Sequence, residues 1–96
     1  MDQTIIDAIE NKFLLQFYYD GNERIVEPHC YGQTLKGNDA IRAFQVGGDS
    51  SREITGWKLF DLSKTSSLIS LDKTFDSPRP GYKKGDAGMS NIYVEL

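Results

Sequence analysis

Residues 13–29 run FLLQFYYDGNERIVEPH, two segments rich in aromatic and β-branched residues joined by an Asp-Gly pair. Asp and Gly tolerate the positive φ that tight hairpin turns need, so the pattern predicts antiparallel strands over residues 13–19 and 24–29. The second segment ends in Glu-Pro-His, and Pro28 has no N–H to donate to a neighbouring strand. We therefore expect Pro28 at a sheet edge or at the end of its strand.

A short helix is predicted before this hairpin, within residues 1–12. Ile5, Ala8 and Ile9 recur at three- and four-residue spacing, which places them on one helical face. Asp2 is the expected N-cap, because its carboxylate can accept hydrogen bonds from the amides of the first turn. We expect the apolar face of this helix to pack against the sheet.

The remaining β segments follow the hairpin at short intervals. Strands are predicted at residues 40–46, 56–61 and 67–75, with a polar loop at 32–38, a Gly- and Ser-rich turn at 47–51 and a helical turn at 62–65. In the last strand, Ile69, Leu71 and Phe75 are expected on one face. The predicted fold class is mainly β: an N-terminal α-helix followed by a five-stranded antiparallel barrel of the Sm-like or SH3-like kind.

The last part of the chain, residues 76–96, differs in kind. Two of the three prolines and three of the nine glycines lie within residues 77–88, which predicts a mobile arm. Residues 91–96 alternate again and are expected to form an extra edge strand, in the chain's own sheet or in a neighbour's. We expect a single domain over residues 1–96, with its barrel at 13–75. A basic cluster with one aromatic ring in the arm can touch a phosphate backbone: Arg79, Tyr82, Lys83 and Lys84.

The composition narrows the class of protein. The chain has 96 residues and one cysteine, so it can bury a core but cannot form an internal disulfide. It has no basic-then-apolar leader and no apolar stretch long enough to cross a bilayer, so we expect a cytoplasmic protein without membrane association. The net charge of −3 argues against coating nucleic acid by bulk electrostatics, but a local basic face remains open.

The sequence offers little for catalysis or metal binding. His29 lies beside Cys30, but a structural zinc site needs four ligands and the sequence holds no other histidine or cysteine. No Gly-x-Ser-x-Gly elbow is present, and the glycines of residues 81–88 fit neither a P-loop nor a dinucleotide fingerprint. We expect no metal, no cofactor and no enzymatic activity.

Several of these segments together resemble the WYL domain of bacterial regulators. The resemblance is carried by the helix at residues 5–9 leading into residues 17–19, by residues 24–29 and by residues 58–64 after a central strand, and it covers residues 5–75. It implies a helix followed by a five-stranded Sm-like barrel, and a regulatory module that binds nucleic acid or nucleotide-like ligands on a basic, aromatic face. Such domains typically stand behind a winged helix-turn-helix, so a partner chain with a DNA-binding domain is expected.

The resemblance also selects a candidate ligand site. By position, Arg24, Lys58 and Lys64 match basic residues of the family, although a lysine keeps the charge and loses the guanidinium fork that grips phosphate. The name-giving Trp-Tyr-Leu falls near residues 39–41, which hold no aromatic residue. The candidate residues for binding a ligand or nucleic acid are Arg24, Arg42, Lys58, Lys64, Tyr19 and His29.

Two hypotheses of different classes follow. In the first, Arg24, Arg42, Lys58 and Lys64 converge on one barrel face and hold single-stranded nucleic acid or a nucleotide. In the second, the chain is a protein interaction or oligomerisation module that pairs its tail strand or an exposed sheet edge with another chain or a second copy. If neither hypothesis holds, the four cations are ordinary solvated surface charges and Trp57 packs in the core.

Overall fold

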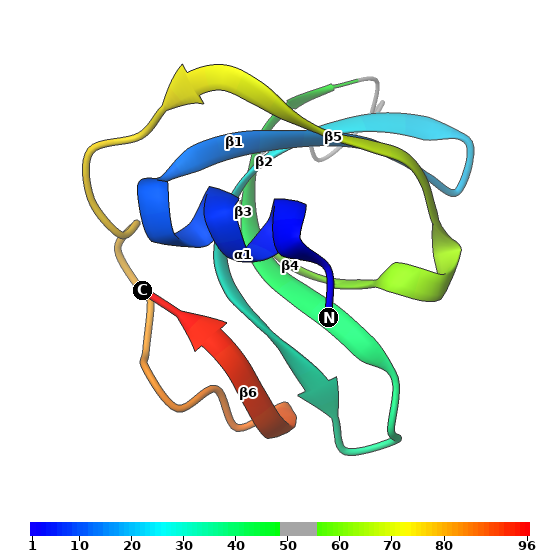
Figure 1. The fold of residues 1–96 in the computed structure, drawn as a ribbon, viewed down its shortest axis with the longest axis vertical. Helices are drawn as coiled ribbons and strands as arrows, with labels where there is room; N and C mark the ends of the chain where they lie inside the picture. The colour runs from blue at the N-terminus through cyan, green and yellow to red at the C-terminus, as the bar shows by residue number, and fades with distance from the viewer. Residues whose placement is uncertain (49–55) are drawn as a thin grey trace.

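The computed structural model describes residues 1–48 and 56–96, and within them it contains one helix and a six-stranded sheet (Figure 1). The elements in chain order are α1 (Gln3–Asn11), β1 (Phe13–Tyr19), β2 (Asn22–Thr34), β3 (Asp39–Gly48), β4 (Gly56–Asp61), the 3-10 turn η1 (Leu62–Lys64), β5 (Thr65–Thr74) and β6 (Met89–Glu95). Every strand pairing is antiparallel; the order is β4-β3-β2-β1-β5, and β6 pairs with β2.

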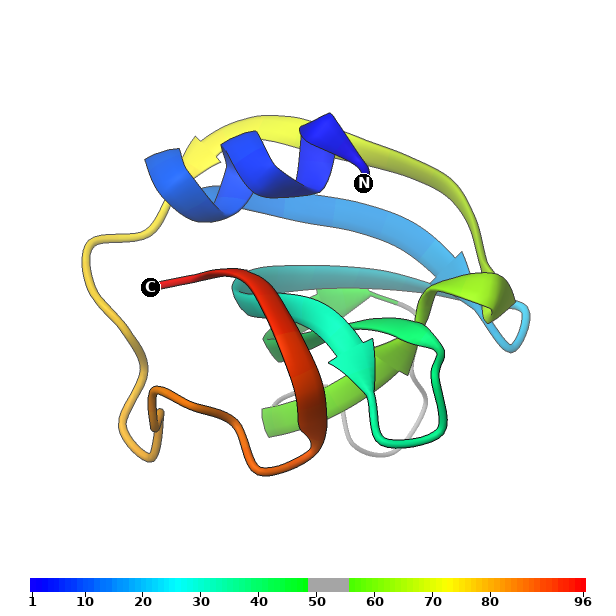
Figure 2. The same ribbon diagram turned by 60° about the horizontal axis from the view of Figure 1, so that its bottom comes forward.

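The prediction of a mainly β fold with an N-terminal helix is confirmed. The sheet has six strands, and within the described residues β4 and β5 stand at the two ends of the strand order, so the sheet is open. It curves around α1, which lies over its concave side (Figures 1 and 2). We call the side that carries the packed core with α1 the inner face, and the opposite side the outer face. No helix in the described ranges has the length and apolar character needed to cross a bilayer.

The helix forms as its sequence predicts. The Asp2 carboxylate accepts hydrogen bonds from the backbone N–H groups of Thr4 and Ile5, at 2.9 and 3.3 Å. Ile5, Ala8 and Ile9 are fully buried in the core of the inner face, and burial of each isoleucine side chain contributes roughly 1.5–3 kcal/mol. The other buried members of this inner core are Leu15, Phe17, Val26, Tyr31, Ile41, Ala43 and Phe60.

The hairpin between β1 and β2 is confirmed, with Tyr19 paired to Asn22 across the turn. Asp20 and Gly21 both have positive φ, 53° and 77°, as a two-residue turn of this kind requires. The strand that follows is much longer than predicted. β2 continues to Thr34 and takes in part of the polar loop expected at residues 32–38.

Pro28 lies in the middle of β2, so the expectation of an edge or strand end was wrong. On one side β2 pairs with β1 as far as Val26 and with β6 from Cys30 onward. Pro28 falls between these two partners, where its missing N–H interrupts neither ladder. The proline marks a change of partner, and a local pattern cannot distinguish this from the end of a strand.

A β-bulge follows immediately. Pro28 pairs with Ala43 and Cys30 with Arg42, so His29 is an extra residue in β2. The extra residue reverses the alternation of side chains. Cys30 therefore belongs to a small second core on the outer face, with Ala40, Met89 and Ile92, while Tyr31 returns to the inner core.

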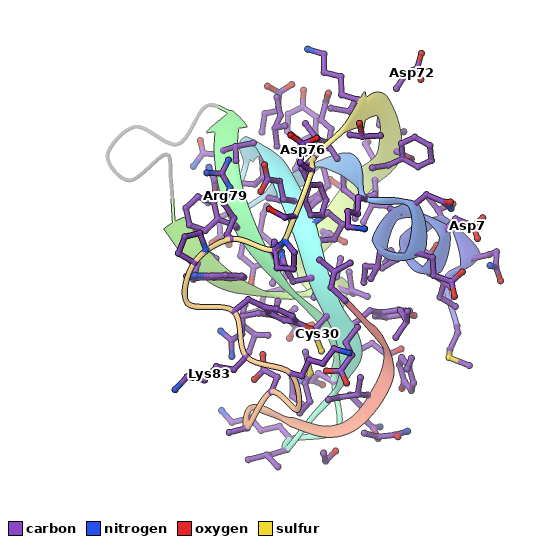
Figure 3. The ribbon with its side chains drawn as sticks, turned by 90° about the vertical axis from the view of Figure 1, so that its left-hand side faces the viewer. Asp7, Cys30, Asp72, Asp76, Arg79 and Lys83 are labelled. Atoms are coloured by element: carbon purple, nitrogen blue, oxygen red, sulfur yellow. The ribbon has the colours of Figure 1, made fainter. Side chains whose placement is uncertain are left out.

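Residues 76–88, the segment predicted as a mobile arm, run as a strap across the outer face of β2, β3 and β4. Figure 3 shows the strap passing in front of β2, with Arg79 and Lys83 along it and Cys30 behind. It ends in β6, which pairs with β2 of the same chain, so the tail strand completes its own sheet.

The predicted boundaries of the other strands need smaller corrections. β5 shifts register twice against β1, Ile69 is 49% exposed, and Phe75, which is 8% exposed, lies after the end of the strand. Gly47 and Gly48 belong to β3. Residues 49–51 of the turn predicted there lie outside the described residues.

Candidate functional site

His29 is the centre of the contacts that hold the strap. Its side chain is fully buried, with ring centroids 4.6 Å from Trp57, 5.4 Å from Phe75 and 5.1 Å from Tyr82. The backbone N–H of Arg79 donates to Nε2 at 3.0 Å, so Nε2 is unprotonated and the ring proton is on Nδ1. Nδ1 lies 2.8 Å from the carbonyl oxygen of Glu27 and donates to it. Burial lowers the pKa of His29 below its usual value, which keeps the ring neutral.

An ion pair fixes the start of the strap beside this histidine. The Arg79 guanidinium donates two hydrogen bonds to the carboxylate of Glu27, Nε to Oε1 at 2.7 Å and Nη2 to Oε2 at 3.0 Å. The same guanidinium lies over the ring of Phe44, 4.7 Å from its centroid. Glu27 is only 5% exposed, so the arginine supplies the partner that its buried charge requires.

The middle of the strap is held by aromatic side chains. Trp57 Nε1 donates to the carbonyl oxygen of Pro80 at 3.0 Å, and the hydroxyl of Tyr82 donates to the carbonyl oxygen of Leu96 at 2.9 Å. Gly81 has φ +92°, and a Cβ there would lie 3.1 Å from Trp57 Nε1, so both backbone angle and space favour glycine. Burial raises the pKa of Tyr82 to about 12, so its hydroxyl stays protonated and available as a donor.

Arg42 binds the far end of the strap and is already paired. Its Nε and Nη2 donate to the two carboxylate oxygens of Asp86 at 2.7 and 3.2 Å. Asp86 also accepts from the backbone N–H of Gly88 at 2.8 Å. These bonds lower the pKa of Asp86, with Arg42 as the largest cause. The charge of Arg42 is therefore used to hold the strap.

Arg24 and Tyr19 lie together on the inner side of the sheet. Arg24 is 9% exposed; its Nη1 donates to Oε1 of Gln45 at 3.2 Å and its Nη2 to the carbonyl oxygen of Tyr19 at 3.4 Å. Its guanidinium carbon is 5.7 Å from the centroid of the Tyr19 ring. Tyr19 in turn packs edge-on against Phe60, with centroids 5.1 Å apart. Both residues thus have structural contacts inside the fold.

The two predicted lysines lie apart. Lys58 pairs with the core residue Ala43 and is two residues from the buried Phe60, which places it on the inner face. Lys64 is exposed in η1. The six candidate residues therefore fall into three places: Arg24, Tyr19 and Lys58 on the inner face, Arg42 and His29 under the strap, and Lys64 at the turn from β4 to β5.

Two hollows lie along β4, one at each end of its outer face. The first, of about 430 Å³, lies between the β2–β3 turn and η1 and is lined by Leu35, Lys36, Leu59, Asp61 and Lys64, among others. The second, of about 350 Å³, lies against the strap and is lined by Arg42, Trp57, Tyr82, Lys83, Lys84 and Asp86, among others. Leu59 and Trp57 are two residues apart on one strand, so the hollows adjoin along β4. Each volume is at the small end of the range for ligand clefts.

Sequence reasoning identified part of this surface. The basic cluster of Lys83 and Lys84 with Tyr82 was recognised from its composition, but Lys36 was not singled out, because a lysine in a turn has no distinguishing local pattern. Trp57 was assigned to the core, whereas it lines the second hollow on the outer face. Among the described residues, no group of three or more His, Cys, Asp or Glu side chains is arranged to hold a metal ion.

Comparisons with known proteins add no further constraint. No family model, no curated protein and no solved structure matches the chain.

Proposed function

We propose that this chain is a small regulatory binding domain of the WYL type, which holds single-stranded nucleic acid or a nucleotide-like anion along the outer face of β4. The observation that carries the proposal is the pair of adjoining hollows, each lined by two lysines: Lys36 and Lys64 in the first, Lys83 and Lys84 in the second. Lysines attract phosphate as point charges without a fixed geometry. Such contacts suit a flexible anionic chain rather than one rigid ligand.

The side chains between the lysines suit the bases of the same ligand. Trp57 and Tyr82 line the second hollow with rings inclined by 23° and centroids 6.2 Å apart, and Leu59 lines the first. Stacking of a base on an aromatic side chain contributes roughly 1–3 kcal/mol and tolerates any base. The combination favours binding of single strands with little sequence preference.

The charges of the surface support an anionic ligand. The carboxylate in the second hollow, Asp86, is neutralised by Arg42, so Lys83 and Lys84 are left in excess. In the first hollow, two lysines face the single carboxylate of Asp61, which accepts hydrogen bonds from Ser63. A surface of this kind can be locally basic although the chain as a whole is acidic.

Membership of the WYL family and a relation of this open, curved sheet to the Sm-like barrel are part of this proposal. They are supported by the element order of a helix, a hairpin and further short strands, and by a curved sheet whose end strands are joined through η1. Within this proposal, Arg24 and Tyr19 have a structural role and the ligand-binding role moves to the outer face. A partner chain with a DNA-binding domain would then convert ligand binding into regulation, and we expect both chains in the cytoplasm.

The test is binding of fluorescent single-stranded oligonucleotides, measured by anisotropy at several salt concentrations. Lys64→Ala and Lys83→Ala should each weaken binding and lower the slope of log K against log salt by roughly 0.7, the value expected for one phosphate contact to a single strand. Lys73→Ala, in the exposed part of β5, is the matched control and should leave binding unchanged. Binding that ignores salt, or that responds equally to Lys73→Ala, would reject the proposal.

A second candidate function is protein interaction, favoured by one observation. On the outer face, Tyr18 of β1 and Ile69 of β5 are 41% and 49% exposed on adjacent strands, and the strap does not reach them. Since β6 is engaged by β2 of its own chain, a partner or a second copy would use an unpaired sheet edge, such as that of β5 beside Ile69. Analytical ultracentrifugation tests self-association: a concentration-dependent mass that Ile69→Ser abolishes supports it, and a constant monomer mass excludes it.

A further inference from the structure

The strap depends on an acceptor that acid can remove. Among the contacts that hold residues 76–88, the bond from the Arg79 N–H to Nε2 of His29 is made to an unprotonated ring nitrogen. The other ring nitrogen already carries its proton and donates it to the carbonyl of Glu27. A protonated imidazole would present N–H groups in both directions, and the N–H of Arg79 would face a donor.

The surroundings of His29 offer little compensation for a positive charge. On β2 the carboxylate of Glu27 attracts it, but both carboxylate oxygens are bound by the guanidinium of Arg79. On the strap, Arg79 repels the charge, and Tyr82 keeps its neutral phenol. The remaining packed groups, Trp57 of β4 and Phe75 after β5, bring no charge and exclude water from the ring.

We propose that His29 is an acid-operated release for the strap: its protonation frees residues 76–88 from the outer face while the inner core stays folded. The two responses are separable because the His29 ring contacts Arg79 and Tyr82 of the strap on the outer face and is not part of the inner core. None of the buried side chains of that core belongs to the strap. The second hollow is lost on release, because Tyr82, Lys83 and Lys84 move with the strap.

Protonation of His29 and opening of the strap are linked, and the linkage sets the direction of the effect. The pKa of His29 is lowered in the closed state, so closure favours the neutral ring, whereas an exposed histidine has its ordinary pKa of about 6.5. The ratio of closed to open strap is therefore constant above that pH. Below it, the ratio falls by up to tenfold for each pH unit until the closed form itself takes up the proton.

The chain provides its own probes for this equilibrium, since His29 is its only histidine and Trp57 its only tryptophan. The experiment titrates the intact protein without ligand from about pH 8 to about pH 4.5. It follows the emission of Trp57, the NMR shifts of the His29 ring, and the amide exchange of Arg79 against that of Val26. We expect the first two to change together and the Arg79 amide to lose protection while Val26 keeps its own.

Two results would overturn the proposal. One is a His29 ring that titrates with no change in Trp57 emission or Arg79 exchange. The other is loss of protection at Arg79 and Val26 at the same pH, which indicates global unfolding. His29→Gln, which keeps a neutral donor and acceptor but does not titrate, should remove the transition above about pH 5, and its persistence counts against His29. Glu27→Gln tests whether the carboxylate of Glu27 is the titrating group. A transition governed by His29 should remain in that variant.

The consequence for ligand binding rests on the proposed function, whereas strap release does not. Oligonucleotide anisotropy over the same pH range separates the two ideas. If the strap opens and the protein binds no oligonucleotide at any pH, the proposed function fails and the release stands. If binding is present and shows no loss through the range in which the strap opens, the second hollow is not part of the ligand site.

Discussion

The two halves of the sheet have the same inner core but differently covered outer faces. Over β3, β4 and the C-terminal half of β2, the strap covers the outer face, and beside it Met89 of β6 forms a second small core with Cys30 and Ala40. Over β1 and β5, Tyr18 and Ile69 remain exposed on the outer face. The comparison shows that the strands alone do not determine which outer face is covered. The cover comes from the proline- and glycine-rich segment, whose side chains find partners far away in the sequence.

The largest effect is expected from the core that both halves share. Phe60 is buried on the inner face, with its ring 4.9 Å from Phe17 and 5.1 Å from Tyr19. Phe60→Ala should lower the free energy of unfolding by about 3–5 kcal/mol, because it removes apolar contacts and leaves a cavity. Denaturant titration measures this loss. A loss below about 1 kcal/mol would mean that the two halves do not depend on one core.

An intermediate effect is expected where the strap begins. Arg79→Ala leaves the carboxylate of Glu27 buried without its ion-pair partner, and should lower the free energy of unfolding by less than Phe60→Ala does, because Arg79 itself is partly exposed. The loss should be confined to the covered half. Trp57 emission should change while amide exchange in β1 stays as it was. Equal loss of protection in both halves would contradict their separation.

The smallest effect is expected on the uncovered half. Ile69→Ser replaces an exposed side chain that the strap does not contact, so stability should change by about 0.5 kcal/mol or less. Thermal unfolding of the monomer gives the measurement, at a concentration where no association is present. A loss near that of Arg79→Ala would contradict the exposure of Ile69 on this face.

The sequence predicted those parts of the fold that depend on neighbouring residues. The helix followed from apolar spacing and from the capping carboxylate of Asp2, both of which act within one turn. The hairpin followed from an Asp-Gly pair that takes the positive φ of its turn. The length of β2 was missed because Pro28 stands between two partner strands, and only the assembled sheet identifies them.

The candidate site was harder to predict because pairing decides which charges are available. Arg42 is bound by Asp86 and Arg79 by Glu27, at separations of 44 and 52 residues along the chain. Arg24 is enclosed on the inner face. No local pattern distinguishes these arginines from solvated ones, so the predicted convergence of cations could be evaluated only in the folded chain. The lysines, whose charges the proposal uses, gave no stronger signal than the arginines did.

The bulge at His29 lets one strand, β2, contribute side chains to two separate hydrophobic cores through the insertion of a single residue. Before the bulge, even-numbered residues of β2 such as Val26 face the inner core. After it, the odd-numbered Tyr31 faces the inner core and Cys30 faces the second core. β2 thus lies between the two cores. A one-residue deletion here would turn Tyr31 from the inner core to the outer face, so the chain should tolerate a change of length least at this position.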